Sequence, residues 1–376
     1  MKFTANRDVM LKAMARINSI VDAKSPIQII GNVKISAQKA SGSVFLTGTD
    51  MDMEVVVRCD ASIVSDGDAT VPCRVLHDIL RKLPDGAAVD VGVGDDAATL
   101  RSGRSRFKLA VLPAADFPEM TVGSLPTNFK LPAADLLGLI DRTAFAVSTE
   151  DTRYYLNGTY LHQAQREGVQ VLRAVATDGH RLARADLPLP TGAGGMDGVI
   201  LPRKLLGELA RMLDGAGKTE VALAVSPTQI RIEIGDARVT SKLIDGTFPD
   251  YDRVVPSNFS EVIEIYSPED LIDSVQRVSV ISNDKSRRVA IDAAGDAMKI
   301  SSSATDGGQS TDEIDIRYRG KGVSIGFNSA YLLDVAGQFK GSDLPLRMAV
   351  VNAEAPAVFT SEADTSILYV LMPMRG

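Results

Sequence analysis

The segment at residues 175–188, VATDGHRLARADLP, holds the side chains of this chain that are best suited to chemistry. Asp178 and His180 lie two residues apart, and the 376 residues include only three histidines. An aspartate that orients a histidine is the arrangement of a general base. The same letters also fit a tight turn, because Asp-Gly between alternating apolar residues is a strong hairpin signal. A hydrolytic centre and a structural turn are therefore both open interpretations of this segment.

The rest of the sequence gives a hydrolytic centre little support. The chain contains no GxSxG elbow, no HExxH motif and no Walker-type phosphate loop. His77 and His162 have no partner pattern around them, and Cys59 and Cys73 lie fourteen residues apart without a CxxC motif. We expect no catalytic residue, no metal and no cofactor, and we expect both cysteines to be buried or bystander thiols.

Composition places the chain among globular proteins of two or three domains. Hydrophobic residues make up 45% of the sequence, which is enough to form a sizeable core. No apolar run approaches the ~20 residues that span a bilayer, and the first residues lack a secretory signal, so a cytoplasmic location is expected. A net charge of −7 argues against a uniformly basic nucleic-acid-binding surface but leaves a local one possible.

The elements that must position the 175–188 segment repeat three times along the chain. Phe3, Phe129 and Phe259 each precede an amphipathic helical pattern, and a second helix follows 60 to 70 residues later in each copy. Prolines 72 and 202 suit first turns, and Asn328 suits an N-cap. The six helices are predicted at residues 5–21, 73–83, 132–147, 202–213, 268–283 and 327–340.

Alternating strand patterns fill the sequence between the helices and share a motif. The triplets GTD, ATD and ATD recur at residues 48–50, 176–178 and 304–306, so the first role predicted for Asp178 is a turn common to all copies. Only the middle copy continues with Gly-His-Arg. The pattern predicts an α+β fold of three tandem domains with antiparallel sheets, at residues 1–126, 127–257 and 258–376.

These motifs resemble the bacterial DNA polymerase III β subunit, the sliding clamp, from end to end. The matching segments include MKFT, LTGTDMDME, LRSGRSRF, LPAADFP, RYYLNG, ATDGHRLA, SKLIDGTFPDY, IGFNSAYLLDV and the closing MPMR. The resemblance implies a homodimer that closes head to tail into a six-domain ring around double-stranded DNA, without reading its sequence. It also implies a processivity factor that tethers the replicative polymerase, the clamp loader and repair proteins through short peptides, with no role at a membrane.

Helix number and charge are consistent with such a ring. Twelve helices packed 8 to 10 Å apart give a circumference of about 110 Å and an opening of about 35 Å, which admits a DNA duplex. The six predicted helices carry a formal charge of +3 within a chain of −7. Weak phosphate attraction by such helices favours sliding over tight binding.

The resemblance also assigns residues to three sites. Partner peptides are expected to bind Leu156, Thr177, Gly179, His180, Arg181, Leu182, Pro249, Arg253, Val254, Asn328, Tyr331, Val370, Met372, Pro373, Met374 and Arg375. DNA is expected to contact Lys24, Arg153, Tyr154 and Tyr155; Glu150 is left out because an acid repels phosphate. Ring closure is expected to place Arg104, Arg106, Phe107 and Leu109 of one subunit against Val280, Ile281, Asp312 and Glu313 of the other.

Each assignment has a structural alternative. The two tyrosines also fit core aromatics that begin a strand, and the closing LYVLMPMR also fits a final core strand with a frayed end. A repeat scaffold that never encloses DNA is a further possibility. A solution mass of about 80 kDa, twice the 40.1 kDa of the chain, is what the ring requires.

Overall fold

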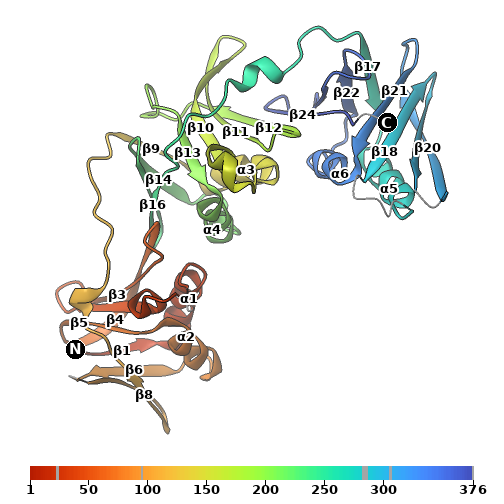
Figure 1. Cartoon of the computed structure of the whole chain (residues 1–376). Helices are drawn as coiled ribbons and strands as arrows, with labels where there is room; N and C mark the ends of the chain where they lie inside the picture. Colours follow the sequence, from red (N-terminus) through yellow and green to blue (C-terminus); the bar gives the residue numbers. More distant parts are fainter. Residues whose placement is uncertain (23–24, 95, 282–286, 305–306, 375–376) are drawn as a thin grey trace. The chain divides into compact units, whose positions relative to one another are not determined.

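A computed structural model describes residues 1–22, 25–94, 96–281, 287–304 and 307–374 (Figure 1). Its contacts divide the chain into two compact units. Unit 1 comprises Met1–Leu137, Pro190–Asp197 and Lys204–Leu243, and unit 2 comprises Gly138–Leu189, Gly198–Arg203 and Ile244–Gly376. None of the helices in the described residues is long and apolar enough to cross a membrane.

All six predicted helices are present. They are α1 (Arg7–Asn18), α2 (Cys73–Lys82), α3 (Ala133–Thr143), α4 (Arg203–Leu213), α5 (Pro268–Ser279) and α6 (Ser329–Gly337). The Asn328 side chain caps α6 as predicted, because it accepts hydrogen bonds from the backbone of Ala330 and Tyr331. Pro72 and Pro202 instead end the strands that precede α2 and α4, where the fixed φ of proline suits extended backbone.

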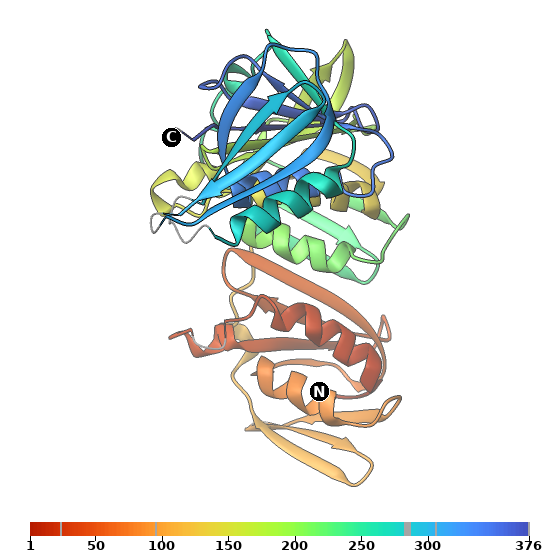
Figure 2. The same ribbon diagram turned by 90° about the vertical axis from the view of Figure 1, so that its right-hand side faces the viewer.

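Unit 1 contains one antiparallel sheet whose strands follow the order β8-β7-β6-β1-β4-β16-β15-β14-β9, with β2, β3 and β5 attached beside this path. In Figure 2, α1 and α2 lie side by side against these strands. The buried side chains of α1, which include Met10, Met14 and Ile17, follow the helical period. The strands are β1 (Lys2–Asn6), β2 (Asn32–Gln38), β3 (Ser43–Thr49), β4 (Met53–Ser65), β5 (Gly67–Pro72), β6 (Ala88–Val93), β7 (Ala97–Ser102), β8 (Ser105–Ala110), β9 (Thr127–Pro132), β14 (Glu220–Val225), β15 (Gln229–Ile234) and β16 (Ala237–Lys242).

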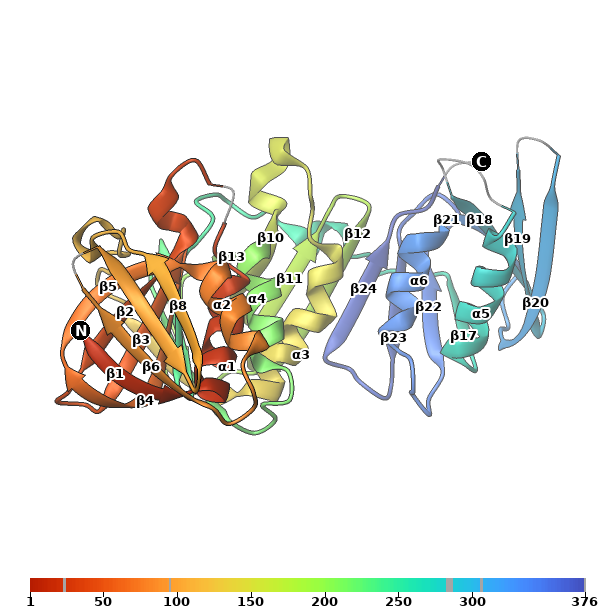
Figure 3. The same ribbon diagram turned by 90° about the horizontal axis from the view of Figure 1, so that it is seen from below.

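Unit 2 contains a second antiparallel sheet, in the order β13-β10-β11-β12-β24-β23-β22-β17-β20-β19-β18-β21. Helices α5 and α6 pack against each other beside it (Figure 3). The strands are β10 (Gly158–Arg166), β11 (Val169–Thr177), β12 (Arg181–Pro188), β13 (Val199–Pro202), β17 (Glu261–Ile265), β18 (Arg288–Ala294), β19 (Ala297–Ser303), β20 (Gln309–Arg317), β21 (Val323–Asn328), β22 (Leu346–Val350), β23 (Ala357–Ser361) and β24 (Ile367–Leu371).

The strands of the middle repeat are shared between the two sheets. Strand β16 pairs with β4 of the first repeat, from Ala237 opposite Val57 to Ser241 opposite Met53. Strand β12 pairs with β24 of the third repeat, from Arg181 opposite Leu371 to Ala185 opposite Ile367. Neighbouring repeats therefore join edge to edge, which satisfies strand edges that would otherwise be open. The predicted domain boundaries at 126 and 257 remain a prediction.

One of the three phenylalanines used to align the repeats is not equivalent to the others. Phe3 and Phe129 are buried in the strands that lead into α1 and α3. Phe259 precedes β17 and is 38% exposed, whereas Ile263 is buried in that strand. The alignment of Phe259 was wrong because it lies nine residues before α5, whereas Phe3 and Phe129 each lie four residues before their helices. Ile263, five residues before α5, takes the buried position instead.

Candidate functional site

The ATDGHRL segment forms the turn between β11 and β12. Asp178 Oδ1 accepts hydrogen bonds from the backbone N–H groups of His180 (2.9 Å) and Arg181 (3.0 Å). Thr177 Oγ1 donates to the Arg181 carbonyl (2.7 Å) and accepts from the Gly179 N–H (3.1 Å). Gly179 adopts φ = +88°, a conformation that strains residues with a Cβ.

The first repeat contains the same turn. Asp50 Oδ1 accepts from the backbone N–H groups of Asp52 (3.0 Å) and Met53 (2.7 Å), and Thr49 Oγ1 donates to the Met53 carbonyl (2.9 Å). The prediction that Asp178 first serves a shared turn is thus confirmed for these two copies. Asp306, in the third copy, lies outside the described residues.

This geometry does not form a catalytic pair. The carboxylate of Asp178 bonds to backbone N–H groups and to the Arg181 side chain, whose Nε lies 3.1 Å from Oδ2. The His180 ring instead stacks on Tyr331, with ring centroids 6.0 Å apart. Within the described ranges, no group of histidine, cysteine and acidic side chains could hold a metal ion. Asp178 and His180 are therefore each engaged with other groups around this turn.

Arg181 is held by partners from three segments of unit 2. Its Nη2 donates to the Phe145 carbonyl at 2.6 Å, and its Nη1 pairs with Asp334 of α6. The guanidinium carbon lies 4.4 Å from the Tyr331 ring centroid and 5.2 Å from that of Phe145. These contacts fix the orientation of the Arg181 side chain, which shares the Tyr331 ring with His180.

An apolar cluster lies next to this turn, on one face of β11, β12 and β24. It brings together the predicted residues Leu156, Leu182 and Val370. Phe248 and Tyr251 pack on it, and the Tyr160 ring stacks on Phe248 at 5.0 Å. Sequence reasoning missed these aromatics as part of the site, although the Phe-Pro pair at 248–249 was a signal. The full cluster is Leu156, Val175, Leu182, Ile200, Phe248, Tyr251, Val358 and Val370.

The C-terminal segment runs from the core to the surface beside the cluster. Strand β24 ends at Leu371, and the Met372 N–H then donates to the His180 carbonyl at 2.9 Å. The Met374 N–H donates to the Gly326 carbonyl at 2.8 Å. Met372 is 40% exposed, so its flexible thioether is available to a ligand. Pro373 lies between them, and Arg375 lies outside the described residues.

The remaining predicted peptide contacts lie in or just before a short 3₁₀ helix (Tyr251–Val254), and at the start of α6. Pro249 is exposed, and Arg253 pairs with Asp250 at 2.7 Å. Val254 is 48% exposed, so its apolar side chain is accessible to a ligand. Asn328 has a structural role as the cap of α6, and Tyr331 contributes its ring to His180 and Arg181.

Of the predicted DNA contacts, Arg153 and Tyr155 already have partners within the chain, whereas Tyr154 is exposed. Glu150 and Arg153 form an ion pair, with Arg153 Nε 2.9 Å from Glu150 Oε2, and this hydrogen bond lowers the pKa of Glu150. Arg153 Nη2 also donates to the Asp178 carbonyl at 3.0 Å, so much of its bonding capacity is used inside the chain. Tyr154 is exposed in a 3₁₀ helix, not in a strand, whereas Tyr155 packs against the apolar cluster. Lys24 lies outside the described residues.

The predicted interface residues lie on or just before β8 in unit 1, and after α5 and on β20 in unit 2. Strand β8, with Arg104 just before it, is the last strand of its sheet in unit 1, and its Leu109 is already buried there. In unit 2, Val280 follows α5 and is 80% exposed. Asp312 already pairs with Arg277 at 2.6 Å, so it is less available to a second cation than Glu313.

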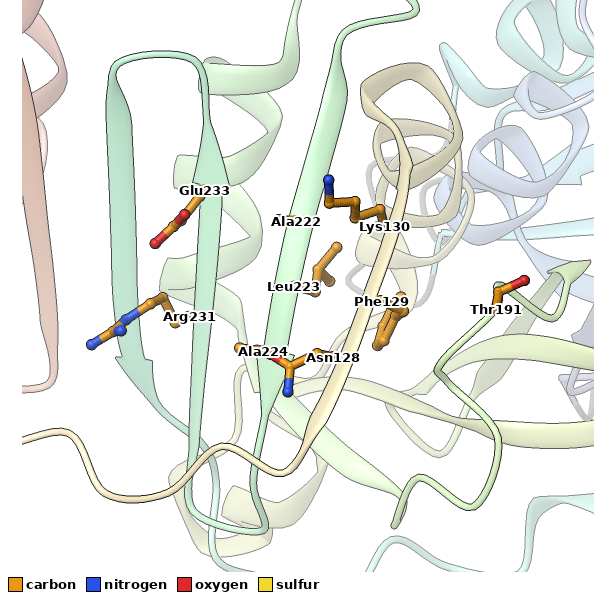
Figure 4. A pocket seen from close by; sticks show the side chains of 9 residues that line it. All are labelled: Asn128, Phe129, Lys130, Thr191, Ala222, Leu223, Ala224, Arg231 and Glu233. Carbon is orange, nitrogen blue, oxygen red and sulfur yellow. The ribbon is translucent and has the colours of Figure 1, made fainter.

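A hollow of about 600 Å³ lies elsewhere, in unit 1 (Figure 4). Ala222 and Ala224 form its floor between the long side chains of Lys130 and Arg231. It includes none of the residues predicted for peptide, DNA or subunit contacts.

Comparison with known proteins identifies the family of the chain. The sequence models of the DNA polymerase III beta subunit match in order, with the N-terminal domain at residues 1–121, the central domain at 130–250 and the C-terminal domain at 252–375. The chain belongs to the DNA polymerase III beta subunit family. It is 43% identical to the beta sliding clamp of Caulobacter vibrioides and 38% identical to that of Escherichia coli K12, with all of each chain covered.

Solved structures of this family share the fold over the whole chain. A beta sliding clamp from Caulobacter crescentus, solved with bound polyethylene glycol, has a TM-score of 0.96 at 41% identity and covers 100% of this chain and 99% of its own. A DnaN sliding clamp from Bartonella birtlesii, bound to griselimycin, has a TM-score of 0.95 at 41% identity with both chains fully covered. The beta subunit family thus accounts for the three tandem α+β domains.

Proposed function

We propose that this chain is a DNA sliding clamp, a processivity factor that encircles duplex DNA as a head-to-tail homodimer. The observation that carries the proposal is the match of all three beta subunit domains, in order, along the full chain. It acts in the cytoplasm, where bacterial DNA is replicated, and it has no catalytic residues of its own.

Partners are tethered through the apolar surface of unit 2. Leu182 and Val370 supply apolar floor, and Met372 supplies an adaptable side chain at its margin. His180 and Arg181 supply polar groups whose orientation is fixed by contacts with Tyr331 and Phe145. Such a surface suits a short, extended and partly apolar peptide from the replicative polymerase, the clamp loader or a repair protein.

Topological retention on DNA tests the ring directly. The chain is loaded by its clamp loader onto a nicked circular plasmid and separated from free protein by gel filtration in 0.2 M salt. We expect retention on the circle and release when a restriction enzyme linearises it, because an encircling protein slides off free ends. Retention that survives linearisation indicates ordinary affinity for DNA and contradicts the ring. A scaffold that never encloses DNA is not retained on either form.

A further inference from the structure

The face of the sheet that carries the apolar cluster also carries a buried ion pair. Arg173 Nε lies 2.7 Å from Asp186 Oδ1, and Arg173 Nη2 lies 2.9 Å from Oδ2. Both side chains are almost fully buried. This bidentate arrangement uses both oxygens of the carboxylate, so Asp186 is committed to Arg173.

A second arginine, Arg184, lies beside this pair and forms no ion pair with the carboxylates in the described part of the chain. Arg184 Nε is buried and has no hydrogen-bond partner among the described residues. Desolvation and the nearby charge of Arg173 lower the pKa of Arg184, although Asp186 and Asp252 partly offset this effect. A guanidinium carries five N–H donors, and leaving a buried donor unpaired costs free energy.

The strand register places Arg184 at the margin of the apolar cluster. It lies directly opposite Val175 on β11 and opposite Leu368 on β24. Val175 belongs to the cluster and Leu368 packs against it. Directly opposed residues have Cβ atoms about 4.5 to 5.5 Å apart, and Leu182, two positions earlier, points to the same side.

Polar side chains of Tyr251, His162 and Arg173 form a hydrogen-bonded group near Arg184. The Tyr251 hydroxyl lies 3.0 Å from His162 Nε2 and 3.4 Å from Arg173 Nη1. The His162 ring also stacks on Tyr160, and burial lowers its pKa, which favours the neutral ring. With Arg173 neutralised by Asp186, Arg184 remains as a partly exposed cation between this polar group and the apolar cluster.

We infer that Arg184 binds the carboxylate of an aspartate or glutamate in a partner peptide, next to the surface that holds the apolar side chains of that peptide. The inference rests on the proposed binding of peptides by unit 2. A planar guanidinium binds a carboxylate through two parallel hydrogen bonds, which favours acidic peptides over neutral ones.

A glutamate scan of one peptide tests this inference. The clamp-binding peptide of the replicative polymerase is acetylated, amidated and labelled with fluorescein, and its acidic residues are replaced by amides. Glutamate is then introduced at each position in turn. Dissociation constants are measured by fluorescence anisotropy for the native chain, for Arg184→Gln and for Arg319→Gln, which removes an exposed arginine of the same unit.

We expect glutamate at one position to tighten binding to the native chain and to Arg319→Gln about tenfold, and to change binding to Arg184→Gln less than twofold. A gain that is similar at every position, or that persists in Arg184→Gln, overturns the inference. If Arg184→Gln does not fold, Arg184→Lys is measured with the same peptides. Lysine keeps the positive charge but cannot donate two parallel hydrogen bonds, so the glutamate-dependent gain in affinity should fall to about threefold. An unchanged gain in affinity contradicts paired hydrogen bonding.

The neutral peptide separates this inference from the proposed function. It should bind the native chain and Arg184→Gln equally, because the apolar surface is intact in both. Failure of the native chain to bind either peptide contradicts peptide tethering itself. Equal binding of the neutral peptide without any position-specific gain from glutamate contradicts only the role of Arg184.

Discussion

At the scale of single residues, one turn serves two purposes in different repeats. Asp50 and Asp178 accept the same pair of backbone hydrogen bonds, but only Asp178 also binds an arginine side chain, which packs against Phe145 and Tyr331. Asp50 instead pairs with Lys204. The turn is the common element, and the residues that follow it decide whether it contributes to a binding surface.

Asp178→Ala should therefore weaken both folding and peptide binding. The substitution leaves the N–H groups of His180 and Arg181 without their acceptor, and we expect a loss of about 1 to 2 kcal/mol in the free energy of unfolding. Binding of the polymerase peptide should weaken about tenfold because Arg181 loses an orienting partner. Thermal unfolding and fluorescence anisotropy measure the two effects.

Asp50→Ala is the matched control for this substitution. It removes the same turn hydrogen bonds in unit 1, so stability should fall by a similar amount while peptide affinity stays unchanged. Equal loss of affinity in both variants would show that the turn acts only through global stability.

At the scale of elements, β24 and the segment after it have separate roles. Tyr369 and Leu371 of β24 are buried in the core. Met372 and Met374 each donate one backbone hydrogen bond, to the carbonyls of His180 and Gly326. The alternative of a final core strand thus holds as far as Leu371, and the residues beyond it are available for binding.

Deleting Met372–Gly376 should separate folding from peptide binding. We expect a folded dimer that is still retained on circular DNA, because no residue of the buried core is removed. A polymerase peptide of micromolar affinity, about −8 kcal/mol, should lose most of its binding. Unfolding of unit 2, seen by circular dichroism, or an unchanged peptide affinity would exclude this site assignment.

At the scale of the whole molecule, the two sheets present strand edges that could pair between subunits. Strand β8 ends its sheet, and β20 pairs with β17 only at Ile316 and Arg317, so residues 309–315 have a free edge on that side in the described structure. One edge of each kind per chain allows a head-to-tail contact that is used twice and closes. Val280, 80% exposed, suits burial in such a contact.

Ile281→Asp should give folded monomers at micromolar concentration. A buried charge in the apolar centre of the interface is costly, whereas rim charges such as Arg104 and Arg106 contribute little. Light scattering should report about 40 kDa in place of about 80 kDa. Leu344→Asp, at an exposed apolar residue elsewhere in unit 2, is the control and should remain dimeric. A dimer mass for Ile281→Asp argues against this interface.

The sequence by itself determined the local structure and the repeat. The period of apolar residues located all six helices, and the ATD triplet located the turn at Asp178, because both signals depend on neighbours within a few residues. Both cysteines are free and buried, as expected, and burial raises the pKa of each thiol to about 12. The ordered motifs were sufficient to indicate the family.

Only the tertiary structure decided which distant residues meet. Arg181 is held by Phe145 and Asp334, which lie 36 and 153 positions away in the chain, and no local period predicts such partners. The pairing of β4 with β16 and of β12 with β24 likewise depends on which strand edges are left open after each repeat has formed. Only the strand register shows that Asp186 pairs with Arg173 and leaves Arg184 Nε without a partner among the described residues. Hydrogen-bond partners depend on how the chain packs, not on sequence order.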